Sequence, residues 1–154
     1  MKPKVNIVMP TWNALEYTKI TLSRLFESTK VPFILTIIDN ASRKETIDFL
    51  KKIKSQGSCI KINKIFNQKN LGSGRAFNQG WQISREEDIE FTCLINNDLY
   101  FSRGWLEALL TEMEAPKIGA VAPIGVSQYS NYFDGMRNSR KVFEENLTDR
   151  KSVV

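Results

Sequence analysis

The stretch Phe91-Thr-Cys-Leu-Ile-Asn-Asn-Asp98 joins a largely apolar run to three polar residues. An apolar run of this length, bounded by polar residues, is typical of a buried strand. A carboxylate in the middle of such a strand would be costly to bury, so the polar side chains are expected at its end. Ligands of open α/β sheets bind at the carboxyl ends of the strands. The stretch therefore predicts a site at the end of this strand, with Asp98 in it.

Two interpretations of Asp98 follow from the residues alone. Its carboxylate could hold Mg²⁺ or Mn²⁺, because such hard cations take oxygen ligands, often one or two carboxylates plus substrate phosphates. Alternatively, Asp98 starts a turn or caps the next helix, as Asp and Asn often do. Both interpretations stay open at this point.

The composition is that of an ordinary globular protein. The 154 residues are enough for one domain with a sizeable core, and 42% of them are hydrophobic and 25% charged. The chain contains no histidine, which excludes a histidine base, a histidine metal ligand and a Ser-His-Asp triad. The net charge of +5 suits anionic substrates or an acidic membrane surface. The basic residues are scattered, and we expect no nucleic-acid partner.

The cysteines and the hydropathy pattern bear on the compartment. Cys59 and Cys93 stand in separate strand-like segments without metal-ligand spacing, and we interpret them as buried apolar residues of a reduced protein. No apolar run reaches the length of about 18 residues that indicates a transmembrane helix, and the N-terminus lacks the pattern of a signal peptide. We expect a cytoplasmic protein, with peripheral attachment to a membrane as an alternative.

Strand-like and helix-like segments alternate along the chain. Strands are expected at 5–9, 33–38, 60–66, 91–95 and 118–122. Helices with apolar residues at helical spacing are expected at 13–26, 42–53, 75–84 and 102–113. The alternation predicts an α/β fold with right-handed crossovers and a mostly parallel sheet covered by helices on both faces. The segment 60–66 begins with alternating apolar and polar residues, which places it at or near a sheet edge.

Individual residues refine these boundaries. Pro10 is expected to end the first strand. Asn13 and Ser42 are each followed three residues later by Glu, the pattern of a capping box, and Ser102 is expected to cap the last helix. The three tryptophans at 12, 81 and 105 are interpreted as core residues.

Four polar loops are expected at the same edge of the sheet. Three follow strands: Pro10-Thr-Trp-Asn13, Asp39-Asn-Ala-Ser42 and Asn96-Asn-Asp98. The fourth, 70–78, opens a helix and carries glycines at 72 and 74, which would leave backbone amides free to approach an anion. These glycines could also be ordinary loop and cap residues. A dinucleotide fingerprint would need glycine at 77, where Phe77 stands, so a dehydrogenase is disfavoured.

These loops together resemble a family-2 glycosyltransferase of the GT-A fold, which is a Rossmann-like three-layer α/β/α architecture. The resemblance runs in order from about residue 4 to residue 124. It rests on Pro10-Thr-Trp-Asn13, Asp39-Asn-Ala-Ser42, Asn70-Leu-Gly72 with Arg75, Ala76, Asn78 and Gly80, and Asn96-Asn-Asp98 with Gly104-Trp105.

The resemblance implies an enzyme that binds a UDP- or dTDP-sugar with Mg²⁺ or Mn²⁺ and transfers the sugar to a saccharide, lipid-linked or protein hydroxyl. It implies that Thr11 and Asp39 hold the base and ribose and that Arg75 lies near the diphosphate. Asp98 corresponds to the last residue of the family's Asp-x-Asp motif and is the implied metal ligand, while Asn96 replaces the first carboxylate of that motif. The implied nucleotide-sugar contacts are Pro10, Thr11, Asn13, Asp39, Asn40, Ser42, Asn70, Gly72, Arg75, Asn78, Asn96 and Asn97.

The chain departs from the family in length, because family catalytic domains are usually longer. The acidic residues beyond the last expected strand stand in no base motif, so the catalytic base stays unassigned. We expect residues 1–126 to form the nucleotide-sugar-binding domain, truncated after the fifth strand. Residues 127–154 are expected to form a partly helical or irregular tail that covers the sheet edge or self-associates. The alternative function is a nucleotide-binding half-domain that lacks the acceptor side and transfers no sugar.

Overall fold

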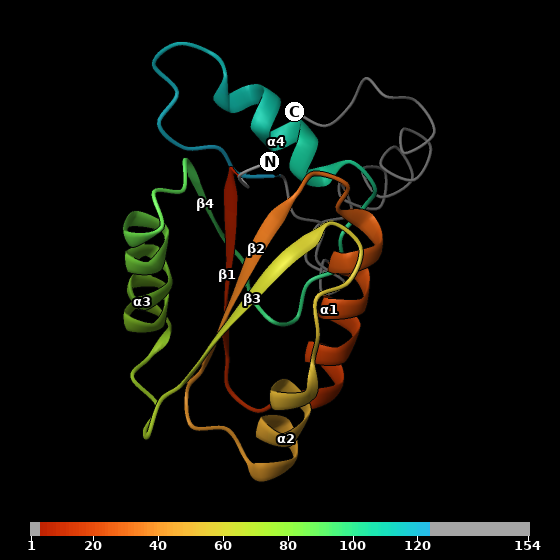
Figure 1. The fold of residues 1–154 in the computed structure, drawn as a ribbon, viewed down its shortest axis with the longest axis vertical. Coiled ribbons are helices and arrows are strands. Elements are labelled where there is room, and N and C mark those ends of the chain that lie inside the picture. The colour runs from red at the N-terminus through yellow and green to blue at the C-terminus, as the bar shows by residue number, and fades with distance from the viewer. Residues whose placement is uncertain (1–3, 124–154) are drawn as a thin grey trace, which may run out of the picture. The chain divides into compact units, whose positions relative to one another are not determined.

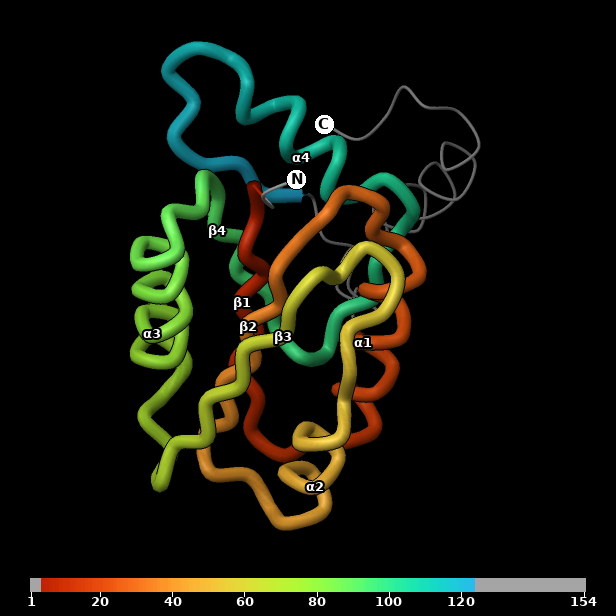
Figure 2. The backbone as a smooth tube through the Cα atoms, in the orientation of Figure 1, coloured from red at the N-terminus to blue at the C-terminus, as the bar shows by residue number. Residues whose placement is uncertain are grey.

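The computed structural model describes residues 4–123, and Figures 1 and 2 show their helices and strands. The chain divides into two compact units, the first ending at Arg103 and the second beginning at Gly104. The second unit contains α4 (Trp105–Met113). The first unit contains, in chain order, β1 (Val5–Thr11), α1 (Leu15–Ser28), β2 (Phe33–Asp39), α2 (Lys44–Lys52), β3 (Cys59–Phe66), α3 (Ser73–Glu86) and β4 (Phe91–Leu94).

The first unit is built on one parallel sheet. Its four strands lie in the order β3-β2-β1-β4, and all three neighbouring pairs are parallel. Helix α3 lies on one face, with α1 and α2 on the other (Figure 1). The predicted α/β architecture with a parallel sheet is confirmed, and so is the edge position of β3.

Helix α3 packs closely on β1 because glycine stands at the contact. A Cβ atom at Gly80 would lie 2.2 Å from Val8 Cγ1. On the same face Val8, Ile38 and Ala76 form a fully buried cluster. The small residues of α3 therefore set how near this helix lies to the sheet.

A buried polar residue also fixes α3 on the sheet. The Asn6 side-chain amide is fully buried on β1 and donates to Gly80 O at 3.2 Å and to Ser84 Oγ at 2.9 Å. Its Oδ1 accepts a hydrogen bond from Thr36 Oγ1 of β2 at 2.8 Å. Every polar atom of this amide thus has a partner, as a buried amide requires, and the bonds set the register of α3.

Pro10 does not end β1, which continues to Thr11. Proline lacks a backbone donor, so it is tolerated where no ladder bond is needed. The β4 ladder beside β1 ends with the bond from Ile95 N to Val8 O at 3.0 Å. The backbone polar groups of residues 8 and 10 point to the same side of β1, the side of β4. Since β4 does not extend as far as Pro10, no ladder bond needs a donor there.

The expectations for β4 and for 118–122 need correction. The residues of β4 are half-buried up to Cys93, and Leu94 is 53% exposed, because the strand pairs with β1 alone among the described residues. Within residues 4–123, the segment 118–122 forms no strand. Gly119, Ala120 and Ala122 have low strand propensity. The expected fifth strand is therefore wrong for the described residues.

Helix α4 begins without the expected side-chain cap. Its N-cap is Gly104, in the left-handed conformation with φ 75, and no side chain bonds to the free amides there. Ser102 lies before this position, so its expected capping role is wrong. No helix among the described residues is long and apolar enough to cross a membrane.

Candidate functional site

The predicted site residues of β1 and β2 lie side by side. Thr11 and Asp39 are register partners at the carboxyl ends of the two strands, and both are 1% exposed. Thr11 Oγ1 and Asp39 Oδ1 are buried and have no hydrogen-bond partner within residues 4–123. The other carboxylate oxygen, Asp39 Oδ2, accepts from the Ser42 backbone N–H at 3.0 Å. Buried polar atoms normally have partners, so two unsatisfied oxygens on neighbouring strands indicate a candidate ligand site at this edge.

The loops that follow β1 and β2 are cross-linked by hydrogen bonds. The Asn13 backbone N–H donates to Ser42 Oγ at 2.7 Å, and the Arg43 backbone N–H donates to Asn13 Oδ1 at 2.8 Å. Neither Asn13 nor Ser42 caps the next helix as predicted: the N-caps of α1 and α2 are Ala14 and Arg43, without side-chain cap bonds. Both side chains bond to the opposite loop instead.

Strained backbone conformations gather in the same two loops. Asn13, Ala14 and Ala41 have φ values of 56, 51 and 60. Non-glycine residues rarely adopt positive φ, and such strain often accompanies functional sites. The crossed hydrogen bonds hold these conformations in place.

A cluster of side-chain amides joins the end of β2 to the loop before α3. Asn67 and Gln79 exchange two hydrogen bonds of 3.0 Å each. Asn67 Nδ2 also donates to Asn40 Oδ1 at 2.9 Å, and Asn40 Nδ2 donates to Gly72 O at 3.3 Å. Asn40 is therefore a structural partner of the Gly72 loop. Asn67 and Gln79 are not among the site residues predicted from the sequence, although an Asn directly after β3 is a signal that the sequence contains.

The loop before α3 leaves its backbone accessible. Gly72 has φ 81, and its backbone N–H donates to Asn70 Oδ1 at 2.8 Å. A Cβ atom added at Gly72 or Gly74 would meet nothing within 4 Å. Asn70, Arg75 and Asn78 are exposed. The first turn of α3 thus offers open space beside a helix N-terminus, where anions are favoured.

The Asn-Asn-Asp stretch forms a turn after β4. Asn96 and Asp98 are exposed, whereas Asn97 is half-buried and its Nδ2 donates to Thr18 Oγ1 of α1 at 2.9 Å. The residues described contain no group of three or more acidic or cysteine side chains placed to hold a metal. One exposed carboxylate still fits a cation that takes its other ligands from water and substrate phosphates.

Two aromatic residues lie where the sequence analysis did not expect them. Trp12 is 57% exposed between Thr11 and Asn13, and Trp81 is 50% exposed with the Arg85 guanidinium 5.0 Å from its ring centre. Their interpretation as core residues is wrong, because both stand on the outer side of their elements; Trp105 alone of the three is buried.

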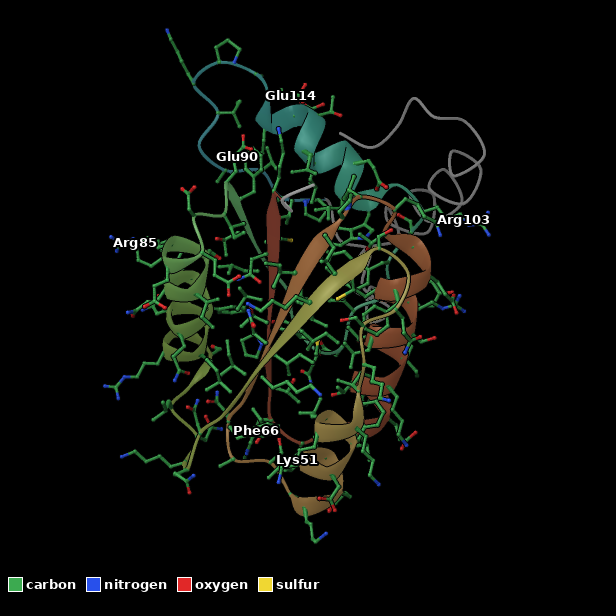
Figure 3. All side chains as sticks on the ribbon, viewed as in Figure 1. Lys51, Phe66, Arg85, Glu90, Arg103 and Glu114 are labelled. Carbon is green, nitrogen blue, oxygen red and sulfur yellow. The ribbon has the colours of Figure 1, made fainter. Side chains whose placement is uncertain are left out.

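Phe66 extends the row of Thr11 and Asp39 across a third strand. It is the register partner of Asp39, so its side chain lies on the same face. The Lys51 ammonium lies 5.8 Å from the Phe66 ring centre, and Figure 3 shows both residues where α2 lies beside the end of β3. Phe66 is not predicted as a site residue from the sequence, because the register between strands cannot be read from one strand alone.

The fold and these loops agree with the comparison with known families. The family model for glycosyl transferase family 2 matches residues 6–153. The chain belongs to glycosyltransferase family 2. No curated protein matches this family-2 chain.

Solved structures share the GT-A fold of this family-2 chain. The mannosyltransferase PcManGT from Pyrobaculum calidifontis, in complex with GDP-Man and Mn²⁺, matches with 18% identity and a TM-score of 0.69 over 82% of this chain and 36% of that one. TarS 1–349 from S. aureus matches with 21% identity and a TM-score of 0.60, over 81% of this chain and 38% of that one. TarS 1–349 in complex with UDP matches with a TM-score of 0.61. The chain therefore spans less than two fifths of the length of these structures.

Proposed function

We propose that this chain binds a nucleoside-diphosphate sugar at the carboxyl edge of its sheet, with a divalent metal, and transfers the sugar to a hydroxyl acceptor. The observation that carries the proposal is the pair of buried, unpartnered oxygens on Thr11 and Asp39. Membership of glycosyltransferase family 2 supports the reaction class. UDP- and dTDP-sugars are the proposed donors, and a saccharide, a lipid-linked sugar or a protein hydroxyl is the proposed acceptor.

The base is assigned to the ends of β1 and β2. Asp39 Oδ1 is an acceptor without a donor, and uracil and thymine carry an N–H that supplies one. Thr11 Oγ1 provides a second polar atom in the same row. Since neither oxygen is open to solvent, a base reaches them only when nearby side chains move aside. The exposed indole of Trp12 is then available to stack on the base.

The diphosphate is assigned to the start of α3. The backbone of Gly72 and Gly74 is unobstructed, and the N-terminus of a helix favours an anion. The exposed Arg75 guanidinium stands in the first turn of this helix and supplies a positive charge. Asn70 and Asn78 are exposed beside it and offer further donors.

The metal is assigned to Asp98, with Asn96 as a weaker neutral partner. Asp98 is exposed and makes no hydrogen bond or ion pair within residues 4–123, so its carboxylate is available. Bound Mg²⁺ or Mn²⁺ would neutralise charge on the leaving diphosphate. The PcManGT complex contains Mn²⁺, which supports metal use in a protein of the same fold.

The second candidate is a nucleotide-binding half-domain that binds the donor without transferring the sugar. Its support is the short span of the match to the solved structures, 36% and 38% of their lengths. No catalytic base is assigned in this chain. A base must reach the acceptor hydroxyl within hydrogen-bonding distance, so the half-domain would bind nucleotide and show no turnover.

Two measurements on the full chain test these proposals. Thermal shift with UDP, dTDP and GDP, each with and without Mn²⁺, tests binding; a ligand at about 100 times its dissociation constant adds about 2.7 kcal/mol to stability. No shift with any nucleotide would contradict both candidates. Nucleotide release from UDP-sugars, with and without sugar acceptors, then separates them: acceptor-dependent release supports the transferase, and binding without release supports the half-domain.

A further inference from the structure

Beyond Leu94 the chain leaves the sheet, and its backbone finds partners on helix α1. The last ladder bond of β4 runs from Ile95 N to Val8 O. The Leu99 backbone N–H then donates to Thr21 Oγ1 at 3.0 Å, and Thr21 Oγ1 donates to Leu99 O at 3.1 Å. One hydroxyl thus satisfies both backbone groups of one residue. Since backbone polar groups need partners, α1 replaces a neighbouring strand here.

The same relationship repeats along one side of α1. Thr18 Oγ1 accepts from Asn97 Nδ2 at 2.9 Å, and Ser28 Oγ donates to Phe101 O at 3.1 Å. We call Thr18, Thr21 and Ser28 the hydroxyl ladder; all three are buried. In Figure 2 the tube between β4 and α4 runs along α1, as these bonds require.

The hydroxyl ladder differs from ordinary Ser and Thr residues of a helix, because its hydroxyls bond to a segment outside the helix. Ser and Thr inside helices usually donate to a carbonyl of their own helix one turn earlier. Thr18 does so, to Ala14 O at 3.1 Å, and still accepts from Asn97. The hydrogen bonds of Thr21 and Ser28 go to the segment 99–101 instead.

The ladder brackets the exposed carboxylate. The residue before Asp98 is held through its side chain by Thr18, and the residue after it is held through its backbone by Thr21. Asp98 itself makes no bond within the described residues. The backbone on both sides is fixed, while the carboxylate stays free for a ligand.

We propose that Thr18 and Thr21 are positioning residues that hold the Asn97–Leu99 turn so that Asp98 presents its carboxylate to a divalent metal. The inference rests on the proposed metal role of Asp98. A ligand held in advance loses less conformational freedom when it binds. Removing a ladder hydroxyl is therefore expected to weaken the metal-dependent part of nucleotide binding and to leave the metal-free part unchanged.

The test uses Thr21→Val, which keeps the shape and removes the hydroxyl, and Thr21→Ser, which keeps the hydroxyl. The control is Ser23→Ala, on the exposed side of the same helix, where the hydroxyl bonds only to Glu27 at 3.3 Å. Hydrogen exchange of a peptide covering 97–101 is measured beside the UDP affinity with and without Mn²⁺. Thr18→Val is the second variant, in case Thr21→Val lowers stability too far.

In Thr21→Val, exchange of that peptide is expected to rise and the Mn²⁺-dependent gain in UDP affinity to fall about three- to tenfold, the size of one lost hydrogen bond. Thr21→Ser and Ser23→Ala are both expected to keep the exchange rate and the Mn²⁺-dependent gain of the parent chain. Unchanged exchange, or an unchanged Mn²⁺-dependent gain in Thr21→Val, would overturn the ladder's role. A parent chain with no Mn²⁺-dependent gain at all would overturn the metal role proposed for Asp98 and the ladder's role with it.

Discussion

The Asn13 backbone N–H lies 2.7 Å from Ser42 Oγ, and this hydrogen bond joins the loops after β1 and β2. The return bond runs from the Arg43 N–H to Asn13 Oδ1. One atom of each bond belongs to Asn13, which has a left-handed conformation with φ 56. The two bonds therefore tie the loop after β1 to the loop after β2.

Ser42→Ala is therefore expected to weaken both the fold and the site. It removes the acceptor for the Asn13 N–H and should lower the free energy of unfolding by about 1 kcal/mol. UDP affinity should fall as well, because the loop that follows Thr11 loosens. Calorimetry and urea unfolding measure the two effects. Ser58→Ala is the control: it removes one hydroxyl bond, to Lys30 O at 2.9 Å, away from this edge. Equal UDP affinity in both variants would contradict the loop's role.

Asp39→Asn should reduce the selectivity for the base. The substitution replaces an acceptor oxygen with an amide NH₂ donor, which would face the N–H donor of the base. Such a mismatch of buried polar groups costs about 1–3 kcal/mol. The preference for UDP over CDP, measured by calorimetry, is expected to shrink. Asp48→Asn, in an exposed ion pair with Lys44 on α2, serves as the control and should leave the preference unchanged. A full UDP preference in Asp39→Asn would rule out the assignment.

Asp98→Ala is expected to abolish the effect of metal and to leave the fold intact. The carboxylate is exposed, and exposed sites tolerate substitution within about 0.5 kcal/mol. Thermal shifts with UDP should become the same with and without Mn²⁺. Asp88→Ala, in the turn after α3, is the control and should retain the difference. If Asp98→Ala also retains it, Asp98 is not the metal ligand.

Gly80→Ala should destabilise the protein, because its Cβ would meet the Val8 side chain at 2.2 Å. Overpacking of this kind costs about 1–3 kcal/mol. Gly74→Ala, in the same helix, meets nothing within 4 Å. Alanine favours a helix over glycine by up to about 1 kcal/mol, so this control should be neutral or stabilising. Urea unfolding of the two variants measures the difference, and equal midpoints would contradict the close approach of α3.

Both cysteines are expected to be unreactive in the folded protein. Burial raises the pKa of the Cys93 thiol to about 12 and also raises the pKa of Cys59. At pH 7.5 almost no thiolate is present, and the thiolate is the reactive form. Labelling with a disulfide reagent should be slow in buffer and complete in urea. Fast labelling of native protein at pH 7.5 would contradict the raised pKa values of these thiols.

The same shift has a consequence for stability at high pH. The folded state holds the Cys93 proton more tightly than the unfolded state, whose thiol pKa is about 8.5. Its contribution is fully present below that value and is lost as the pH rises toward about 12. Cys93→Ala should reduce the fall in the free energy of unfolding between pH 8 and pH 10. Each unit of difference in pKa between the two states corresponds to about 1.36 kcal/mol. An identical pH profile would contradict the shift.

The domain boundary at residue 126 and the behaviour of residues 127–154, including self-association, remain proposals. These residues lie outside the described part of the chain. Membership of family 2 over residues 6–153 nevertheless shows that the matched sequence extends past this boundary.

The sequence alone determined the architecture, and it predicts which edge of the sheet carries the site. Apolar runs alternate with amphipathic helices, and this pattern requires parallel strands joined by helical crossovers. The carboxyl ends of parallel strands meet at one edge of the sheet, so the sequence predicts that Thr11 and Asp39 lie near each other. The structure makes them direct partners.

Only the tertiary structure decided which polar side chains are free to bind and which hold the fold. Asn13 and Ser42 follow a helix-capping pattern, yet they bond to each other's loops. Thr18 and Thr21 follow an ordinary helical pattern, yet they hold a segment 78 and 79 residues away. The physical reason is that the partner of a polar group depends on which distant segment packs beside it, and local sequence carries no record of that neighbour.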